Sequence, residues 1–153
     1  MSKKRVDIVS IRLVKEASTL WEYRKIQNPT DAYNLLKNFL SDFDKEKFLV
    51  VCLNTKNEPV NIHTVSIGCI NKTMVKPMDV MKTAILSNCN KILIAHNHPS
   101  GDPSPSKDDI SMTERIKNAG KILGIEIIDH IIIAGIKYYS FLEDQLLFEK
   151  TKK

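Results

Sequence analysis

The chain has few cysteines, no long apolar run and no repeated segment, and each of these absences excludes some classes of protein. The three cysteines, Cys52, Cys69 and Cys89, are odd in number and form no C-x-x-C pair. This pattern predicts reduced, partly buried thiols in a reducing compartment rather than a disulfide framework. No apolar run is long enough for a membrane span, and the basic residues 3–5 precede no apolar core of the signal-peptide type. We therefore expect a cytoplasmic protein without a membrane anchor.

The sequence also lacks a concentrated basic stripe. Its net charge of +5 is spread over both ends, at residues 3–5 and 150–153. No basic patch with interleaved aromatic residues and no helix-turn-helix pattern accompanies that charge, so nothing predicts sequence-specific recognition of DNA. Electrostatic DNA binding stays open as an alternative. The H-x-E and P-C-x-x-C elements of zinc nucleobase deaminases are missing, which excludes that class of enzyme.

The length of 153 residues and the 42% hydrophobic content predict one soluble globular unit. Within it, residues 1–28 are expected to form an N-terminal strand (6–14) and an irregular connection (15–28) packed on the main domain, residues 29–153. Trp21 and Tyr23 are expected to anchor the connection to the core. Apolar periodicity predicts strands over residues 48–53, 59–67, 91–95, 125–134 and 137–140, and helices over 29–40, 78–86 and 107 to 120 or 123. The expected class is α/β (α+β), with a single mixed β-sheet flanked by helices.

The stretch HNHPSGDPSPSKDD, residues 96–109, follows the predicted strand 91–95 and contains the densest set of possible metal ligands. If the chain stays extended, His96 and His98 lie on the same face because strand side chains repeat every two residues. The proline-rich turn then leads to Ser106, whose residue type predicts a helix N-cap, and places Asp109 in the first helical turn. Two imidazoles and one carboxylate with an open fourth position match a catalytic zinc site.

The same spacing allows a simpler explanation. Ser106 and Asp109 also form a capping motif, in which the serine accepts a backbone hydrogen bond and the helix dipole favours the acid. Capping and metal binding are compatible, because the capping geometry can also orient the carboxylate.

The spacing H-x-H-P, six residues, S-x-x-D resembles the JAB/MPN (JAMM) metallohydrolases, and HNHPSGDPSPS resembles their RadC branch. The likeness extends to residues 44–48 (DKEKF), 129–132 (DHII) and 139–141 (YSF). It departs at residues 77–79 (PMD), where the family usually has Pro-Arg-Glu. The resemblance implies the JAB/MPN, cytidine-deaminase-like fold and one Zn²⁺ ion held by His96, His98 and Asp109.

The resemblance also implies roles for other residues. Glu46, just before a strand, corresponds to the general base, and Ser106 to the donor that stabilises the oxyanion. Glu58 is the rival acid, but it lies in the predicted hairpin turn. Asp129 and His130 interrupt an apolar strand, so we interpret them first as internal hydrogen-bonding support and second as contacts to a metal-bound histidine. His130 as a direct ligand is the third possibility.

Together these features predict a zinc-dependent metallopeptidase or isopeptidase-like hydrolase with a protein or peptide substrate. The alternative is a non-catalytic RadC-type binding protein in DNA repair or recombination. RadC proteins often carry a helical DNA-associated module ahead of this domain, and we expect none here. The sequence predicts no oligomeric state.

Overall fold

The computed structural model describes residues 1–68 and 75–147 and contains a five-stranded mixed sheet. The strands follow the spatial order β2-β1-β3-β4-β5; β3 and β4 are parallel, and the other neighbours are antiparallel. The strands are β1 (Lys47–Leu53), β2 (Pro59–Ile67), β3 (Lys91–Asn97), β4 (Glu126–Ala134) and β5 (Lys137–Ser140). This sheet and its helices confirm the predicted α/β (α+β) class with a single mixed sheet flanked by helices.

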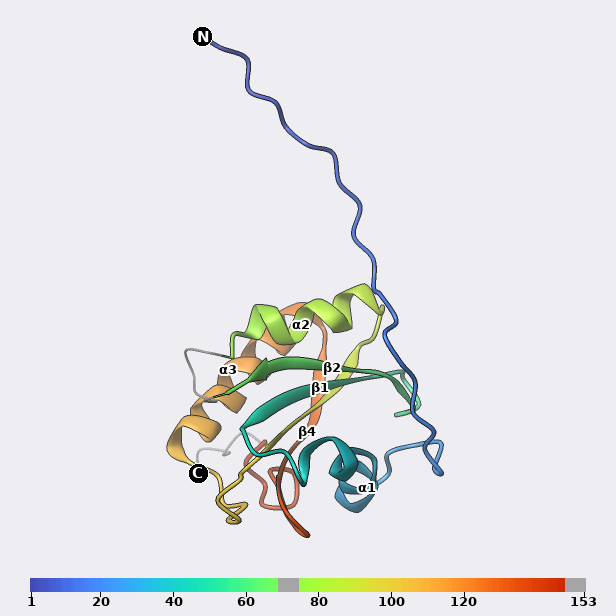
Figure 1. The fold of residues 1–153 in the computed structure, drawn as a ribbon, viewed down its shortest axis with the longest axis vertical. Coiled ribbons are helices and arrows are strands. Elements are labelled where there is room, and N and C mark those ends of the chain that lie inside the picture. Colours follow the sequence, from blue (N-terminus) through green and yellow to red (C-terminus); the bar gives the residue numbers. More distant parts are fainter. Residues whose placement is uncertain (69–74, 148–153) are drawn as a thin grey trace, which may run out of the picture.

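Three helices cover the two faces of the sheet (Figure 1). Helix α1 (Pro29–Leu40) packs against β3 and β4, whereas α2 (Pro77–Leu86) contacts β1 and β2, and α3 (Lys107–Leu123) contacts β4 and α2. Strands β1 and β3 are therefore buried on both faces, which explains their nearly continuous apolar sequences. Alternate residues of these strands enter two separate hydrophobic clusters, one under α1 and one under α2 and α3.

This alternation decides which side of the sheet carries the histidines. In β3, Leu93 and Ala95 face the α1 side, and Ile92 and Ile94 face the α2/α3 side. His96 continues the second series, because side chains two apart share a face. It stacks on Phe48, its partner across the β1–β3 ladder.

The β3–β4 ladder contains an extra residue in β4. Ile92 pairs with Ile127, but the next residue, Leu93, pairs with Asp129, so Ile128 is bulged. Ile127 and Ile132 both lie in the α2/α3-side cluster although an odd number of positions separates them. The bulge therefore resets the alternation and gives His130 the same side of the sheet as Ile94, its partner in β3.

Local sequence explains the helix ends. Helix α1 has Pro29 at its first position and Asn28 as N-cap, whose side chain accepts a hydrogen bond from the Asp31 amide. Helix α3 ends at Gly124, which has a left-handed φ of 71°. Gly120 lies on the buried side of α3, where an added Cβ would overlap the carbonyl oxygen of Ile125. Apart from end residues, the predicted helices and strands within residues 29–140 are confirmed.

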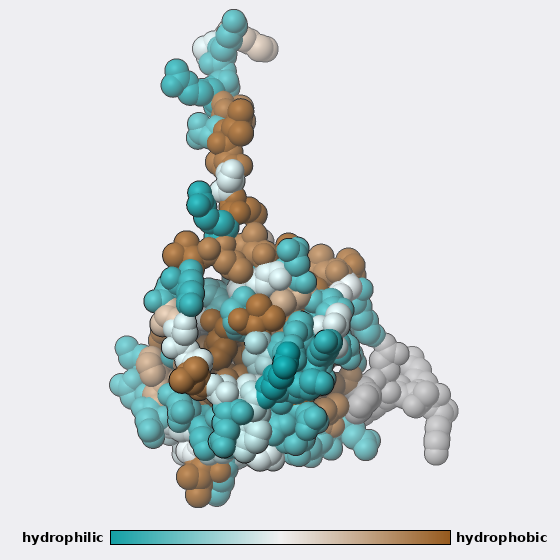
Figure 2. Space-filling view, turned by 90° about the vertical axis from the view of Figure 1, so that its right-hand side faces the viewer, coloured by the Kyte–Doolittle hydropathy of each residue, from teal (hydrophilic) through white to brown (hydrophobic). Residues whose placement is uncertain are grey.

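The predicted edge strand over residues 6–14 is wrong. Residues 1–20 have no regular structure and are exposed, and their N-terminal end extends far from the sheet (Figures 1 and 2). The alternating apolar residues have no neighbouring strand to supply hydrogen bonds or a buried face, and Ile8 is fully exposed. Trp21 packs against the α1-side cluster as predicted, but Tyr23 is exposed.

Two further predictions concern thiols and membranes. Cys52 and Cys89 are buried and free of disulfides, and Cys69 lies outside the described residues. The helices found in residues 1–68 and 75–147 are all too short or too polar to cross a bilayer.

Candidate metal centre

The two histidines of the predicted centre lie where β3 ends. His96 is fully buried, and His98 is partly buried at the first position beyond the strand. The His98 amide donates to the carbonyl of Ile133 in β4, which continues the ladder by one step. The Nε2 atoms of His96 and His98 are 3.0 Å apart, so both rings face the same point.

Asp109 reaches that point from the first turn of α3. Its Oδ1 is 3.2 Å from His96 Nε2, and its Oδ2 is 3.3 Å from His98 Nε2. A capping box holds this position, because Ser106 Oγ accepts from the Asp109 amide and the Ser106 amide donates to Asp109 Oδ2. The capping and convergence predicted from the sequence therefore occur together, and the cap directs the carboxylate toward the histidines.

The three residues could hold a metal ion. Each offers one ligand atom, and these atoms lie within 4.8 Å of one another. Two imidazole nitrogens with one carboxylate oxygen are donors that suit zinc, and three protein ligands leave one tetrahedral position for water or substrate. In the described part of the chain, this is the one group of three or more histidine, cysteine or acidic residues with such geometry.

The electrostatics of the centre favour an ionised Asp109. Burial alone would raise the pKa of Asp109, but hydrogen bonds from His96 and His98, the charge of His96 and the Ser106 amide hold it well below its usual range. The Asp109 hydrogen bond raises the pKa of His98, with smaller contributions from the Asp102 carbonyl and the charge of Glu46. The centre thus presents a fixed negative charge at the point where the imidazoles meet.

The second nitrogen of each imidazole also has a partner. His98 Nδ1 lies 2.9 Å from the carbonyl oxygen of Asp102 in the proline-rich loop. His96 Nδ1 lies 2.9 Å from Nε2 of His130, a fully buried residue of β4. Such outer contacts fix the orientation and tautomer of ligating histidines.

Of the two polar residues that interrupt the apolar run of β4, His130 contacts the centre and Asp129 does not. Asp129 accepts hydrogen bonds from the His130 amide, the Leu142 amide and the Ser140 hydroxyl. Burial raises the pKa of Asp129 to about 6 although these three donors oppose the rise. Burial also lowers the pKa of the His130 imidazole, with a further lowering from His96. Asp129 therefore supports the turn after β5, whereas His130 supports His96.

Glu46 and Glu58, the two acids weighed as a general base, lie at opposite ends of β1. Glu46 precedes the end where Phe48 pairs with His96, and its charge acts on His98. Glu58 lies in the hairpin beyond Leu53, about 20 Å along the strand, where it binds Arg24 and Asn54. The structure brings Glu46 to the end of the sheet that carries the centre and keeps Glu58 away from it.

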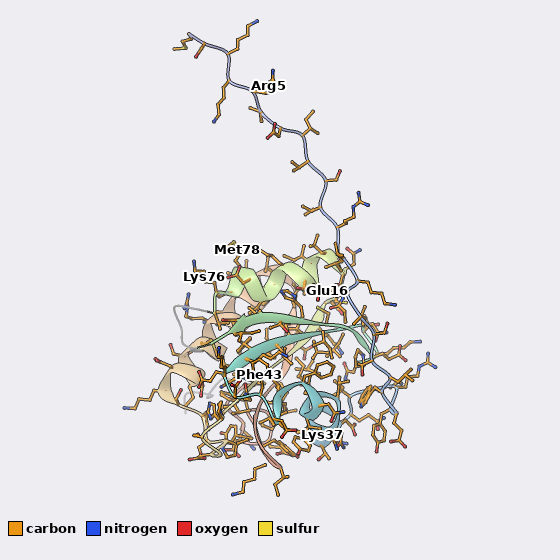
Figure 3. The ribbon with its side chains drawn as sticks, viewed as in Figure 1. Arg5, Glu16, Lys37, Phe43, Lys76 and Met78 are labelled. Atoms are coloured by element: carbon orange, nitrogen blue, oxygen red, sulfur yellow. The ribbon has the colours of Figure 1, made fainter. Side chains whose placement is uncertain are left out.

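Two polar residues near the centre were not identified from the sequence as having a role. Asn97 ties the loop before β1 to β3: its side chain accepts from the Lys47 amide and donates to the carbonyls of Phe43 and Lys45. Phe43 marks this loop between α1 and β1 in Figure 3. Thr113 contacts His130 from α3. Its position four residues after Asp109, on the same helix face, was the available signal.

The departure from the family pattern at residues 77–79 lies on the surface. Met78 is 62% exposed in the first turn of α2 and projects outward there (Figure 3). The acid of this turn, Asp79, pairs with Lys82 of the same helix rather than with the candidate centre.

Comparisons with known proteins agree with this geometry. A family model described as RadC-like JAB domain matches residues 26–146, which include every residue of the candidate centre. UPF0758 proteins are also similar to this chain: one from Methanosarcina barkeri is 43% identical over 121 residues (79% of this chain, 53% of the relative), and one from Alkaliphilus metalliredigens is 46% identical over 123 residues (80% and 53%). The chain spans about half the length of these curated relatives.

Proposed function

The chain belongs to the RadC-like JAB domain family, and on this premise we propose that it is a zinc-dependent hydrolase of amide or isopeptide bonds. The observation that carries the proposal is the convergence of His96, His98 and Asp109 at the end of the central strand. The protein or peptide nature of the substrate belongs to the proposal.

The donor set supports zinc as the resident ion. Zinc accepts a mixture of imidazole and carboxylate ligands, and the three candidates leave one position for a reactant. When bound, zinc supplies a Lewis acid that makes water a nucleophile near neutral pH. The ionised Asp109 and the two ring nitrogens would hold the ion, and His96 is fully buried, so solvent has no access to the centre through its ring.

Glu46 and Ser106 supply the acid–base and oxyanion chemistry in this proposal. Glu46 accepts a proton from the attacking water and passes it to the leaving nitrogen as the C–N bond breaks. Ser106 is exposed and already accepts the Asp109 amide, so its hydroxyl hydrogen is available to the carbonyl oxygen of the substrate as that oxygen gains negative charge. The position of Glu46 beside the histidine end of β1 supports this assignment.

Matched glutamate variants test the proposal. Zinc-loaded wild type, Glu46→Gln and Glu58→Gln would be assayed on fluorogenic libraries of α-peptides and lysine isopeptides, with zinc content measured in parallel. We expect Glu46→Gln to retain zinc and lose at least about 100-fold in kcat, since general-base catalysis contributes 10² or more. Glu58→Gln, which alters the acid at the opposite end of β1, should match wild type in both measurements.

Two results would contradict the proposal. One is a Glu46→Gln variant with wild-type turnover on a substrate that the wild type cleaves. The other is wild-type protein that cleaves no library member in the presence of zinc yet retains DNA in a salt-dependent manner, which would favour the non-catalytic alternative.

A further inference from the structure

A continuous chain of polar contacts runs from the backbone of α3 to the metal-facing nitrogen of His96. Thr113 Oγ1 donates to the carbonyl oxygen of Asp109 at 2.7 Å and lies 2.6 Å from Nδ1 of His130. His130 Nε2 lies 2.9 Å from His96 Nδ1. The far nitrogen of His96, Nε2, faces Asp109 Oδ1. All four residues are at most 3% exposed, so water has little access to these contacts.

The single hydroxyl hydrogen of Thr113 determines which atom donates in each of these contacts. If that hydrogen lies toward the Asp109 carbonyl, Thr113 Oγ1 can accept from His130 Nδ1–H, and both short contacts contain a hydrogen. If it pointed to His130 instead, two oxygen atoms 2.7 Å apart would face each other without one. The first arrangement satisfies both contacts, and it places the ring hydrogen of His130 on Nδ1.

The surroundings of His130 determine which nitrogen donates in its contact with His96. Its ring packs against Phe48 and Phe141, and its nitrogens contact a hydroxyl and an imidazole rather than a carboxylate. A charged ring there would be buried without direct contact to an anion, which is costly. Neutral His130 with its hydrogen on Nδ1 leaves Nε2 as an acceptor, so His96 must supply the hydrogen from its own Nδ1.

We propose that Thr113 and His130 are positioning residues that keep a hydrogen on Nδ1 of His96, so that Nε2 is the nitrogen left to bind the metal. Because Thr113 lies one helical turn after Asp109 and bonds the Asp109 carbonyl, the same turn of α3 supplies one ligand and sets the protonation pattern of another. The proposal rests on the metal-binding part of the proposed function and is independent of amide hydrolysis.

The competing explanation gives Thr113 a purely local role. Buried threonines often bond the carbonyl four residues earlier in their own helix, and that bond alone would satisfy the hydroxyl. Such a role would leave the tautomers of His130 and His96, and the zinc affinity, unaffected by the identity of residue 113.

Long-range ¹⁵N–¹H correlation spectra of the histidine rings test the proposal in metal-free wild-type protein at about pH 8, together with zinc affinity by chelator competition. We expect a hydrogen on Nδ1 of both His96 and His130. Thr113→Val, which replaces the hydroxyl by a methyl group, should redistribute the His130 tautomers and weaken zinc binding about 10-fold or more, in the range for removal of an outer support of a ligand. Thr113→Ser, which restores the hydroxyl, should keep the wild-type tautomers and bind zinc within about 2-fold of wild type.

A wild-type spectrum with the His130 hydrogen on Nε2 would overturn the proposal, and so would a folded Thr113→Val protein with wild-type tautomers and zinc affinity. If Thr113→Val does not fold, the wild-type and Thr113→Ser spectra still test the proposal, because a His130 hydrogen on Nε2 in either protein would overturn it. Because the tautomers are measured without metal or substrate, protein with the expected tautomers but no hydrolase activity would contradict only the proposed function.

Discussion

Asp129 is a buried carboxyl group whose ionisation we expect to weaken the fold between pH 4 and 6. Its pKa is raised from the ordinary 3.8 to about 6, a difference of about 2, which corresponds to about 3 kcal/mol at ~1.36 kcal/mol per unit. A folded-state pKa above the unfolded value means that the folded protein holds the proton more tightly. The stabilising contribution is therefore complete below about pH 4, declines as the pH rises to about 6, and is absent above that.

Asp129→Asn is a suitable reference because an amide fits the same contacts. Asp129 Oδ1 accepts from the amides of His130 and Leu142, which an asparagine oxygen can also do. The asparagine NH₂ can donate to the Ser140 hydroxyl, which now donates to Asp129 Oδ2. The variant therefore keeps the hydrogen bonds and removes the ionisation.

Urea unfolding of wild type and Asp129→Asn at pH 4 and pH 7 gives the measurement. We expect the free energy of unfolding of the variant, relative to wild type, to increase by about 3 kcal/mol between these pH values. A ¹³C titration of the Asp129 carboxyl should give a midpoint near 6. A midpoint below 4, or a wild-type-to-variant difference that does not change with pH, would refute this reasoning.

Three other predictions follow from the fold and the centre. Gly120→Ala should lower the free energy of unfolding by about 1–3 kcal/mol in denaturant titrations, because the new Cβ meets the Ile125 carbonyl. The control Asn118→Ala, on the exposed side of α3, should change the free energy of unfolding by less than about 0.5 kcal/mol. Zinc at 100 times its Kd should stabilise the wild type by about 2.7 kcal/mol in thermal melts, and His98→Ala should lose most of this gain; equal gains in both would argue against the centre. Asn97→Ala, which leaves three backbone groups without their side-chain partner, should cost about 1–3 kcal/mol and reduce kcat more than zinc content; unchanged kcat would show that the loop carrying Glu46 is held by other contacts.

The metal ligands could be predicted from the sequence because their positions depend on local geometry. The two-residue period of a strand places His96 and His98 together, and a capping motif places Asp109 at the start of a helix. The proline-rich loop between them is only a few residues long, so few arrangements of the backbone are possible. The same locality explains why most helix and strand limits within residues 29–140 were predicted well.

The supporting residues depend on pairing between distant segments and could not be predicted in the same way. His130 reaches His96 because β4 lies parallel to β3 with one bulged residue, and periodicity within β4 cannot reveal that register. The contact of Thr113 with His130 also needs α3 to pack over β4. The wrong strand at residues 6–14 has the same origin, because alternation describes a strand but does not supply its partner.

The bulge at Ile128 makes β4 tolerant of a change in length at one point. If Ile128 were deleted, Ile127 and Asp129 would be adjacent in the chain and would pair with the consecutive residues Ile92 and Leu93 of β3. His130 would then keep its orientation toward His96. Loss of Ile131 would instead make His130 and Ile132 adjacent, so one of them would turn to the α1 side of the sheet. A single-residue deletion at the bulge is therefore compatible with an intact centre, whereas loss of Ile131 would set the side of His130 against that of Ile132.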